Sequence, residues 1–315
     1  MQRGTGMLIF VLRKAARAIV TVLLLVTFVF FILRVTGDPA VALVGVDVPL
    51  DALEAVRKRL GLDQPLWTQY AIYLQQLASG DFGRSFVGNR AAWEVVAERL
   101  PNTLLLMGVT AIVTLLIGIP LGIVAALRRD TWVDRVAIGV SVAGLSLPNF
   151  VVGVLLILLF GVGLMILPTT GSETAWHLVL PVMTMATGDA AVFARFSRSA
   201  MLEVLSQPYM RTASAKGRLW RDAVIWHALP NAAIPLVTVI GLYMGRIIVG
   251  AVVTENVFAW PGVGSLLVLS VENRDLAVVQ TIVILVGVTM VLTNLTIDVA
   301  YRWLDPRTAG QEGAQ

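Results

Sequence analysis

The sequence predicts an all-α polytopic membrane protein with six transmembrane helices and cytoplasmic N- and C-termini. The first observation behind this prediction is the composition. Of 315 residues, 57% are hydrophobic and 14% are charged, whereas about 25% are charged in soluble domains. So few charged side chains cannot cover the surface of a water-soluble protein of this length. The second observation is a series of long uncharged runs separated by loops that are rich in basic residues.

Each predicted span is an uncharged run, judged against the roughly 20 helical residues needed to cross a hydrocarbon core of about 30 Å. The runs are 18–33, 100–127, 136–172, 174–188, 223–245 and 276–297. The fourth extends to 194 if Asp189 lies inside the membrane, and the fifth continues past Arg246 to 254. The sequence therefore predicts six spans, with the third in need of a separate explanation.

The third run is too long for one straight span and too short for two. Its 37 residues would form a helix of about 55 Å, whereas two spans with a turn need more than about 40 residues. We therefore predict one span that is broken near Pro148-Asn149. Beyond the break it continues into an outer rim at Gly161, Gly163 and Pro168.

The distribution of basic residues predicts the orientation. Fifteen of the 24 Lys and Arg residues lie in the N-terminal arm, the second and fourth loops and the tail, whereas the short loops opposite hold only Arg274. Lys and Arg collect on cytoplasmic loops, so both termini are predicted to be cytoplasmic and the long first loop external. The basic excess thus has a membrane explanation, which argues against nucleic-acid binding.

A cleaved signal peptide is an alternative interpretation of the first run. A basic start precedes a short apolar stretch and then Val35-Thr36-Gly37, as in secretory signals. Removing this segment would leave five spans and place the mature N-terminus outside, against the basic-residue distribution. We therefore favour a retained span.

The external insert, residues 35–99, is predicted to be folded. One helix is expected over 49–60, with proline early in the helix and Gly61 as its stop. A second is expected after Asp63-Gln64-Pro65 and before Gly80. Its apolar face is predicted to contain Leu66, Tyr70, Leu74 and Leu77. These helices could lie on the membrane surface, cap a pore or dock another protein. The sequence leaves these three possibilities open.

Motif searches find no constellation for catalysis. The chain has no cysteine, no G-x-x-x-x-G-K-[ST] and no H-E-x-x-H, and its only histidines are His177 and His227. An intramembrane enzyme is therefore disfavoured. An ion-driven carrier that works alone is disfavoured too, because such carriers usually contain internal repeats and several buried ionisable side chains. Here there is no repeat, and only Asp189 and Arg246 are deep.

The most informative segment is the cytoplasmic loop 195–227. Basic residues alternate with large apolar ones, Pro208 is expected to divide the loop into two helices, and small side chains occupy the segment from Arg211 to Gly217. Small residues at a helix end allow another surface to approach the backbone closely. An ordinary basic loop lying on lipid headgroups explains the same pattern, and the residues alone do not choose between them.

This loop resembles the cytoplasmic coupling motif of ABC importer permeases, which reads E-A-A, three residues, Gly, nine residues, then I-x-L-P. Arg211-Thr212-Ala213, Gly217 and His227-Ala228-Leu229-Pro230 stand at the corresponding positions. Arg211 replaces the glutamate of the motif and His227 its isoleucine. The form R-T-A-x-A-K-G is nevertheless typical of dipeptide and oligopeptide permeases.

Other landmarks extend the resemblance over about residues 7–307 and indicate the B-type permease of a binding-protein-dependent peptide importer. They are Gly37-Asp38-Pro39, Leu62-Asp63-Gln64-Pro65, Gly80-Asp81-Phe82-Gly83-Arg84-Ser85, Ser146-Leu147-Pro148-Asn149-Phe150, Glu255-Asn256-Val257-Phe258, Trp260-Pro261-Gly262-Val263-Gly264 and Asp305-Pro306-Arg307. The resemblance implies a type I ABC importer transmembrane fold in the bacterial inner membrane. It also implies a non-catalytic subunit that forms half of a path for short peptides.

The same resemblance implies partners and a coupling surface. The partners would be a C-type permease in a heterodimer, two ATPase subunits that carry ATP and magnesium, a substrate-binding protein and membrane lipid. This chain itself would bind no cofactor and no nucleic acid. Cargo stays open between dipeptides, longer peptides, glutathione, nickel complexes and haem. The implied coupling residues are Tyr209, Arg211, Thr212, Ala213, Ser214, Ala215, Lys216, Gly217, Leu229 and Pro230.

Three residues are candidates for the transport path. A mid-membrane charge costs at least about 2.5–3.5 kcal/mol, so it normally faces a cavity or a partner. Asp189 and Arg246 either contact substrate or pair with each other, and the pair is favoured. Glu255 either contacts substrate or holds the turn at Trp260-Pro261-Gly262, and the turn is favoured.

The predicted organisation has four parts. They are an arm with the first helix (1–34), the external insert (35–99), a five-helix permease core (100–307) and a C-terminal tail (308–315). Within the core, two G-x-x-x-G patterns, at Gly118 and Gly122 and at Gly241 and Gly245, predict close contacts between helices.

Overall fold

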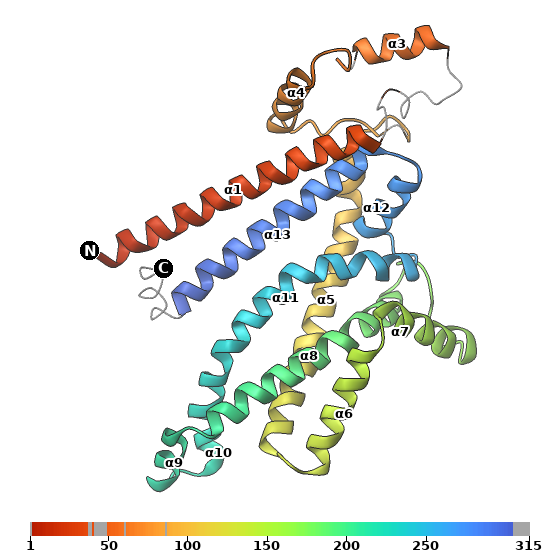
Figure 1. Ribbon diagram of the computed structural model, residues 1–315. Coiled ribbons are helices and arrows are strands. Elements are labelled where there is room, and N and C mark those ends of the chain that lie inside the picture. The colour runs from red at the N-terminus through yellow and green to blue at the C-terminus, as the bar shows by residue number, and fades with distance from the viewer. Residues whose placement is uncertain (1, 37–39, 41–48, 60, 86, 305–315) are drawn as a thin grey trace. The chain divides into compact units, whose positions relative to one another are not determined.

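The computed structural model (Figure 1) describes residues 2–304 except 37–39, 41–48, 60 and 86. Over this part of the chain, every secondary-structure element longer than an isolated bridge is a helix. In chain order the elements are α1 (Gln2–Thr36), α3 (Leu50–Arg59), α4 (Leu66–Ala78), α5 (Ala92–Leu127), α6 (Trp132–Ser146), α7 (Asn149–Leu156), η1 (Ile157–Gly163), η2 (Ala175–Leu178), α8 (Val179–Leu205), α9 (Pro208–Ala215), α10 (Trp220–Ala223), η3 (Val224–Ala228), α11 (Leu229–Val257), α12 (Val263–Glu272) and α13 (Leu276–Leu304).

The helices reproduce the predicted spans. Among the described residues, five helical segments are long and apolar enough to cross a membrane: Val11–Ile32, Ala92–Leu127, Ala175–Leu205, Trp220–Gly245 and Leu276–Ile297. The fourth reaches further than the predicted limit of 188 or 194. Arg195 and Arg198 interrupt the uncharged run there without ending the helix, because arginine is a good helix former.

The third predicted span is the sixth membrane segment, and it is bent. Trp132–Ser146 and Asn149–Gly163 pass the length and hydropathy test together, with an angle of 99° between them. Leu147 has extended backbone angles and Pro148 precedes the first residue of α7. Proline disfavours a helical conformation in the residue before it, which explains why the break predicted near Pro148-Asn149 occurs there.

The chain divides into two compact units. The first contains Met1–Thr103 and Pro261–Leu295, and the second contains Leu104–Trp260 and Thr296–Gln315. Helices α5 and α13 each contribute residues to both units.

In the first unit, α1 lies beside the outer part of α13 (Figure 1), and the insert packs against both. Phe30 of α1 and Ile284 of α13 are buried together with Tyr73 of α4. The Thr27 and Tyr70 hydroxyls are 2.6 Å apart. The second insert helix is therefore attached to the first span by aromatic packing and a hydrogen bond.

The packed face of α4 differs from the predicted one at its start. Leu66 is 56% exposed, whereas Gln69 and Tyr73 are buried. Tyr70, Leu74 and Leu77 do pack against the α1–α13 cluster, as predicted. Gln69 is drawn inward because its side-chain amide donates to the carbonyls of Leu62 (3.1 Å) and Gln64 (2.8 Å).

The first insert helix ends as the sequence predicts. Gly61 has a φ of +65°, and the Leu62 N–H donates to the Arg57 carbonyl at 2.9 Å. This is the left-handed arrangement in which glycine commonly ends helices. Leu60, the last residue of the predicted helix, lies outside the described residues.

A buried polar contact fastens the end of the insert to the start of α13. The Ser85 hydroxyl donates to the Asp275 carboxylate, and both residues are buried. The other oxygen of Asp275 accepts from the Val278 N–H at 3.3 Å, so the carboxylate also caps the first turn of α13. The Gly80–Ser85 landmark thus has a structural role.

Replacing Asp275 by alanine is expected to lower the free energy of unfolding by about 2 kcal/mol, because it removes both the cap and the buried hydrogen bond from the Ser85 hydroxyl. Asp63→Ala, at an exposed position, is the control and should change stability by less than about 0.5 kcal/mol. Denaturation of both purified variants in detergent measures the difference. Equal stability of the two variants would contradict the structural role.

Candidate functional site

The candidate site lies in the second unit, at the end where α9 and α10 are found. Helix α8 ends at Leu205, and α9 begins at Pro208, where the sequence predicts the loop to divide. Gly217, with a φ of +78°, follows the end of α9. The Arg218 N–H donates to the Ala213 carbonyl at 3.3 Å. This short helix is therefore held between a proline start and a glycine stop.

The inner face of α9 packs against the same chain. Met210 and Ala213 are buried in a cluster with Ala200 and Met201 of α8. Ala126 of α5 and Ala223, Val224, Ala228 and Ala232 complete this cluster. Ala213 is therefore buried within its own chain, rather than leaving room for a partner.

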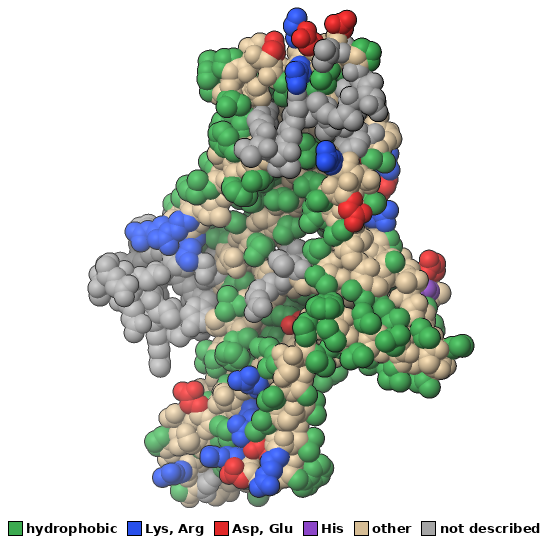
Figure 2. All heavy atoms as spheres, turned by 45° about the vertical axis from the view of Figure 1, so that its right-hand side comes forward, with side chains coloured by type: hydrophobic (Ala, Val, Ile, Leu, Met, Phe, Trp, Pro, Cys, Tyr) green, Lys and Arg blue, Asp and Glu red, His purple; other side chains and the backbone are tan. Residues whose placement is uncertain are grey.

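The outer face of α9 and the turn after it carry basic and large apolar side chains. Figure 2 shows charged side chains gathered around this end of the second unit. The exposed residues are Tyr209, Arg211, Thr212, Ala215, Lys216, Gly217, Arg218, Leu219, Trp220 and Trp226. Leu219 is 72% exposed. We call this set the α9 surface. An exposed mixture of aromatic, apolar and basic residues is typical of protein-binding surfaces.

The remaining predicted coupling residues lie beside this surface. Leu229 begins α11 and packs against the buried cluster that contains Met210 and Ala213. Pro230 follows it and is exposed. Ser214 belongs to α9, and its side chain lies outside the described part of the structure.

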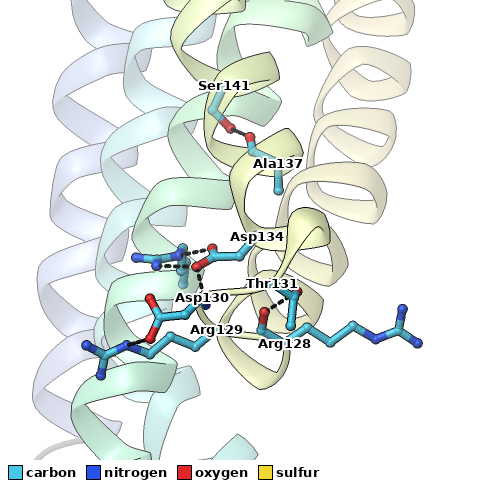
Figure 3. Close-up of polar contacts among 8 residues, drawn as sticks. Arg128, Arg129, Asp130, Thr131, Asp134, Ala137 and Ser141 are labelled. Carbon is cyan, nitrogen blue, oxygen red and sulfur yellow. Dashed lines mark hydrogen bonds and ion pairs between the residues drawn. The ribbon is translucent and has the colours of Figure 1, made fainter.

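A buried ion pair that sequence reasoning missed joins α6 to α8 near the α9 surface (Figure 3). Arg198 Nε donates to Asp134 Oδ1 at 2.6 Å, and Arg198 Nη2 donates to Oδ2 at 2.8 Å. The Asp130 N–H also donates to Oδ2, at 3.0 Å. Asp134 is only 3% exposed. An aspartate in the first turn of an apolar helix was the available signal, but its partner is 64 positions away.

Close contact between α5 and α8 is confirmed for the first glycine pattern. A Cβ on Gly122 would lie 2.2 Å from the Ala194 carbonyl oxygen, and one on Gly118 would lie 2.7 Å from that of Ala190. At Gly241, a Cβ would lie 2.7 Å from the side chain of Ile297 on α13. Only glycine permits these approaches of α5 to the α8 backbone.

The structure describes the side chains of two of the three path candidates, Asp189 and Glu255. Asp189 of α8 interacts with the buried Tyr243 of α11, whose hydroxyl donates to Thr114 Oγ1 at 3.3 Å. Glu255 is fully buried, and its backbone carbonyl accepts from the Trp260 N–H at 2.8 Å. The backbone of Glu255 thus belongs to the turn, and the role of its side chain stays a prediction. The side chain of Arg246 lies outside the described part of the structure.

An open cavity between α6 and α8 was not predicted. It has a volume of about 290 Å³ and is lined by Leu145, Val192, Arg195, Phe196 and Ser199. Arg198, one turn away, is paired with Asp134, whereas Arg195 is exposed and forms no ion pair with any described carboxylate. The cavity therefore offers an apolar wall, a hydroxyl and an available guanidinium. Across the described residues, no group of three or more acidic or histidine side chains could hold a metal ion.

Comparisons with known proteins identify the architecture. A family model described as binding-protein-dependent transport system inner membrane component matches residues 118–310, and the N-terminal model of such membrane components matches 7–107. The glutathione transport system permease protein GsiC of Salmonella choleraesuis is 42% identical over 95% of this chain and 98% of its own length. The GsiC protein of Escherichia coli K12 is 41% identical over the same shares.

A solved structure confirms the predicted fold class. The inward-facing methionine ABC transporter MetNI matches with a TM-score of 0.56 and 19% sequence identity. The match covers 68% of this chain and 97% of that chain. The all-α transmembrane architecture of a type I importer permease is therefore shared, although most residues differ.

Gly122→Leu is expected to prevent tight packing of α5 on α8, because its Cβ would overlap the Ala194 carbonyl. Gly108→Leu is the matched control, since a Cβ at Gly108, on the same helix, meets no atom within 4 Å. Size-exclusion chromatography in detergent should show a large loss of folded protein for Gly122→Leu alone. A normal elution profile for that variant would contradict the contact.

Proposed function

Because this chain belongs to the family of binding-protein-dependent transport system inner membrane components, we propose that it forms half of an import path for short peptides and is driven through its α9 surface. Membership makes it a multi-pass inner-membrane permease subunit of an ABC importer, without catalytic activity of its own. The proposal adds the partners, the coupling residues and the cargo.

The proposed partners are a C-type permease, two ATPase subunits and an external substrate-binding protein. The family description supports the last of these, since it names transport that depends on a binding protein. The sequence has no P-loop, so ATP and magnesium would be bound by the ATPase chains. The second permease would supply the other half of the path.

The proposed coupling site is the α9 surface with the adjoining Leu229 and Pro230. The observation that carries this proposal is the two-sided character of α9. Met210 and Ala213 bury its inner face in a cluster that includes residues of α8, while Arg211, Lys216 and their exposed neighbours are available to a partner. A partner that moves α9 would therefore also move the end of α8. Closure of the ATPase pair on ATP would in this way bias the path between two conformations.

The proposed cargo is a short peptide with a free carboxylate. Two relatives are named for glutathione transport, and glutathione carries two carboxylates. Arg195 in the α6–α8 cavity is a cation without a described acidic partner, and guanidinium binds carboxylates through paired hydrogen bonds. We propose that this cavity belongs to the path and that Arg195 attracts the cargo carboxylate.

Gly217→Leu is expected to abolish ATPase-coupled transport while leaving membrane insertion intact. A Cβ there would meet no atom within 4 Å, but any side chain is strained at a φ of +78°, so the turn after α9 must change. The measurement is ATP hydrolysis stimulated by the binding protein, together with glutathione uptake, in proteoliposomes that contain the complete importer.

Gly80→Leu is the matched control, because Gly80 has a φ of +80° and equally open surroundings but follows α4 in the external insert. It should impose similar backbone strain without uncoupling transport. Normal uptake and hydrolysis by Gly217→Leu would show that the α9 surface is not the coupling site.

Arg195→Gln is expected to reduce glutathione uptake severalfold, because the cavity would lose its cation while keeping its shape. Arg195→Lys should retain most of the activity. Glutathione uptake at saturating binding protein measures the effect. Uptake that is unchanged in Arg195→Gln would remove Arg195 from the path.

A further inference from the structure

The ion pair between Asp134 and Arg198 connects two helices at a point close to the α9 surface. Asp134 is in the first turn of α6, and Arg198 lies two helical turns before α8 ends at Leu205. Two nearly parallel hydrogen bonds, of 2.6 and 2.8 Å, join the guanidinium to the carboxylate. Such a bidentate contact fixes orientation as well as distance. It therefore opposes both sliding and rotation of α6 against this part of α8.

The carboxylate also holds the turn that leads into α6. The Asp130 N–H donates to it at 3.0 Å (Figure 3), and Asp130 has a left-handed φ of +63°. The Arg198 side chain is 23% exposed, while that of Asp134 is 4% exposed. Separating two such charges where little water can replace the partner is unfavourable. The pair is thus suited to stay closed while the helices that carry it move together.

Short paths of packed atoms connect this pair to α9 and to the cavity. Met210 and Ala213 of α9 belong to one buried cluster with Ala200 and Met201, which lie within one turn of Arg198 on α8. On the other side of the pair, α6 continues to Leu145, which lines the cavity and precedes the 99° bend. A displacement of α9 can therefore reach the cavity wall through one helix, one ion pair and a second helix.

We propose that the Asp134–Arg198 pair is a rigid joint through which movement of α9 is transmitted to α6. This inference rests on the proposed coupling function of the α9 surface. Both residues are positioning residues: they act on the path through α6 and need not touch cargo or ATP. Without the joint, α6 would slide on α8, and movement of α9 would be dissipated before it reached Leu145.

Asp134→Asn tests the joint in the complete reconstituted importer. Asparagine keeps the size of the side chain and an oxygen for the Asp130 N–H, but it removes the charge and one acceptor for Arg198. Glutathione transported per ATP hydrolysed is expected to fall about fivefold or more, a typical size for the loss of coupling between two sites, while ATP hydrolysis continues. Glu98→Gln, which breaks the exposed Arg90–Glu98 ion pair, is the control and should leave this ratio unchanged.

Cysteine replacement gives a second test, which distinguishes a pair that stays closed during transport from a pair that must open. The chain has no cysteine, so Asp134→Cys with Arg198→Cys introduces the only two thiols of this subunit. The reduced variant is expected to be uncoupled, and a short bifunctional thiosulfonate that links the two sulfurs should restore transport per ATP. Inhibition by the link would show that the pair must open during the cycle and would overturn the proposal.

The results for Gly217→Leu and Asp134→Asn together distinguish failure of this inference from failure of the coupling proposal on which it rests. If Gly217→Leu uncouples the importer and Asp134→Asn does not, the joint is wrong and the α9 surface stands. If neither variant uncouples it, both proposals fail. Should Asp134→Asn give too little folded protein, Arg198→Lys replaces it, since lysine keeps the charge but not the bidentate geometry. A lowered transport ratio supports the joint, and an unchanged ratio contradicts it.

Discussion

The close approach of α5 to α8 at Gly118 and Gly122 is the contact on which the second unit depends. Between membrane helices there is little hydrophobic driving force, because lipid tails are as apolar as the side chains, so van der Waals packing and polar contacts hold the helices together. At Gly122 the two backbones approach so closely that a single methyl group would overlap the Ala194 carbonyl. That approach brings Ala126 of α5 into the cluster beneath α9. Helix α9 is therefore supported by two spans rather than one.

Two buried carboxylates lie where the chain changes direction. Asp134 binds across the turn between α5 and α6, and Asp275 caps α13 while it accepts from Ser85 of the insert. Both are buried carboxylates whose oxygens have hydrogen-bond donors. A buried acceptor without a donor costs more than a satisfied one contributes, so each carboxylate specifies one arrangement of its turn. Apolar packing then governs the long helical stretches between these points.

The spans could be predicted from the sequence because the membrane imposes a length and excludes charge. The segment 276–297 agrees with the structure at both ends, and the break at Pro148 follows from proline sterics. The apolar run ends before Arg195 and Arg198, whereas α8 carries both residues and continues to Leu205. The partner of Arg198 and the inward position of Ala213 could not be predicted, because both depend on residues brought together from distant parts of the chain. The basic, aromatic character of the α9 surface was visible in the sequence, whereas its separation into an inner and an outer face was not.

The bent third span also has a consequence for the surrounding lipid. Helix α6 has 15 residues, which corresponds to about 22 Å at the usual rise, less than the roughly 30 Å thickness of a hydrocarbon core. The segment beyond the bend runs at 99° to it, so it adds little height along the axis of α6. A short hydrophobic segment is accommodated by thinning of the bilayer or by association with a neighbour. Because α6 packs along α8, its short length is accommodated by association with a neighbouring span, by local thinning of the bilayer, or by both.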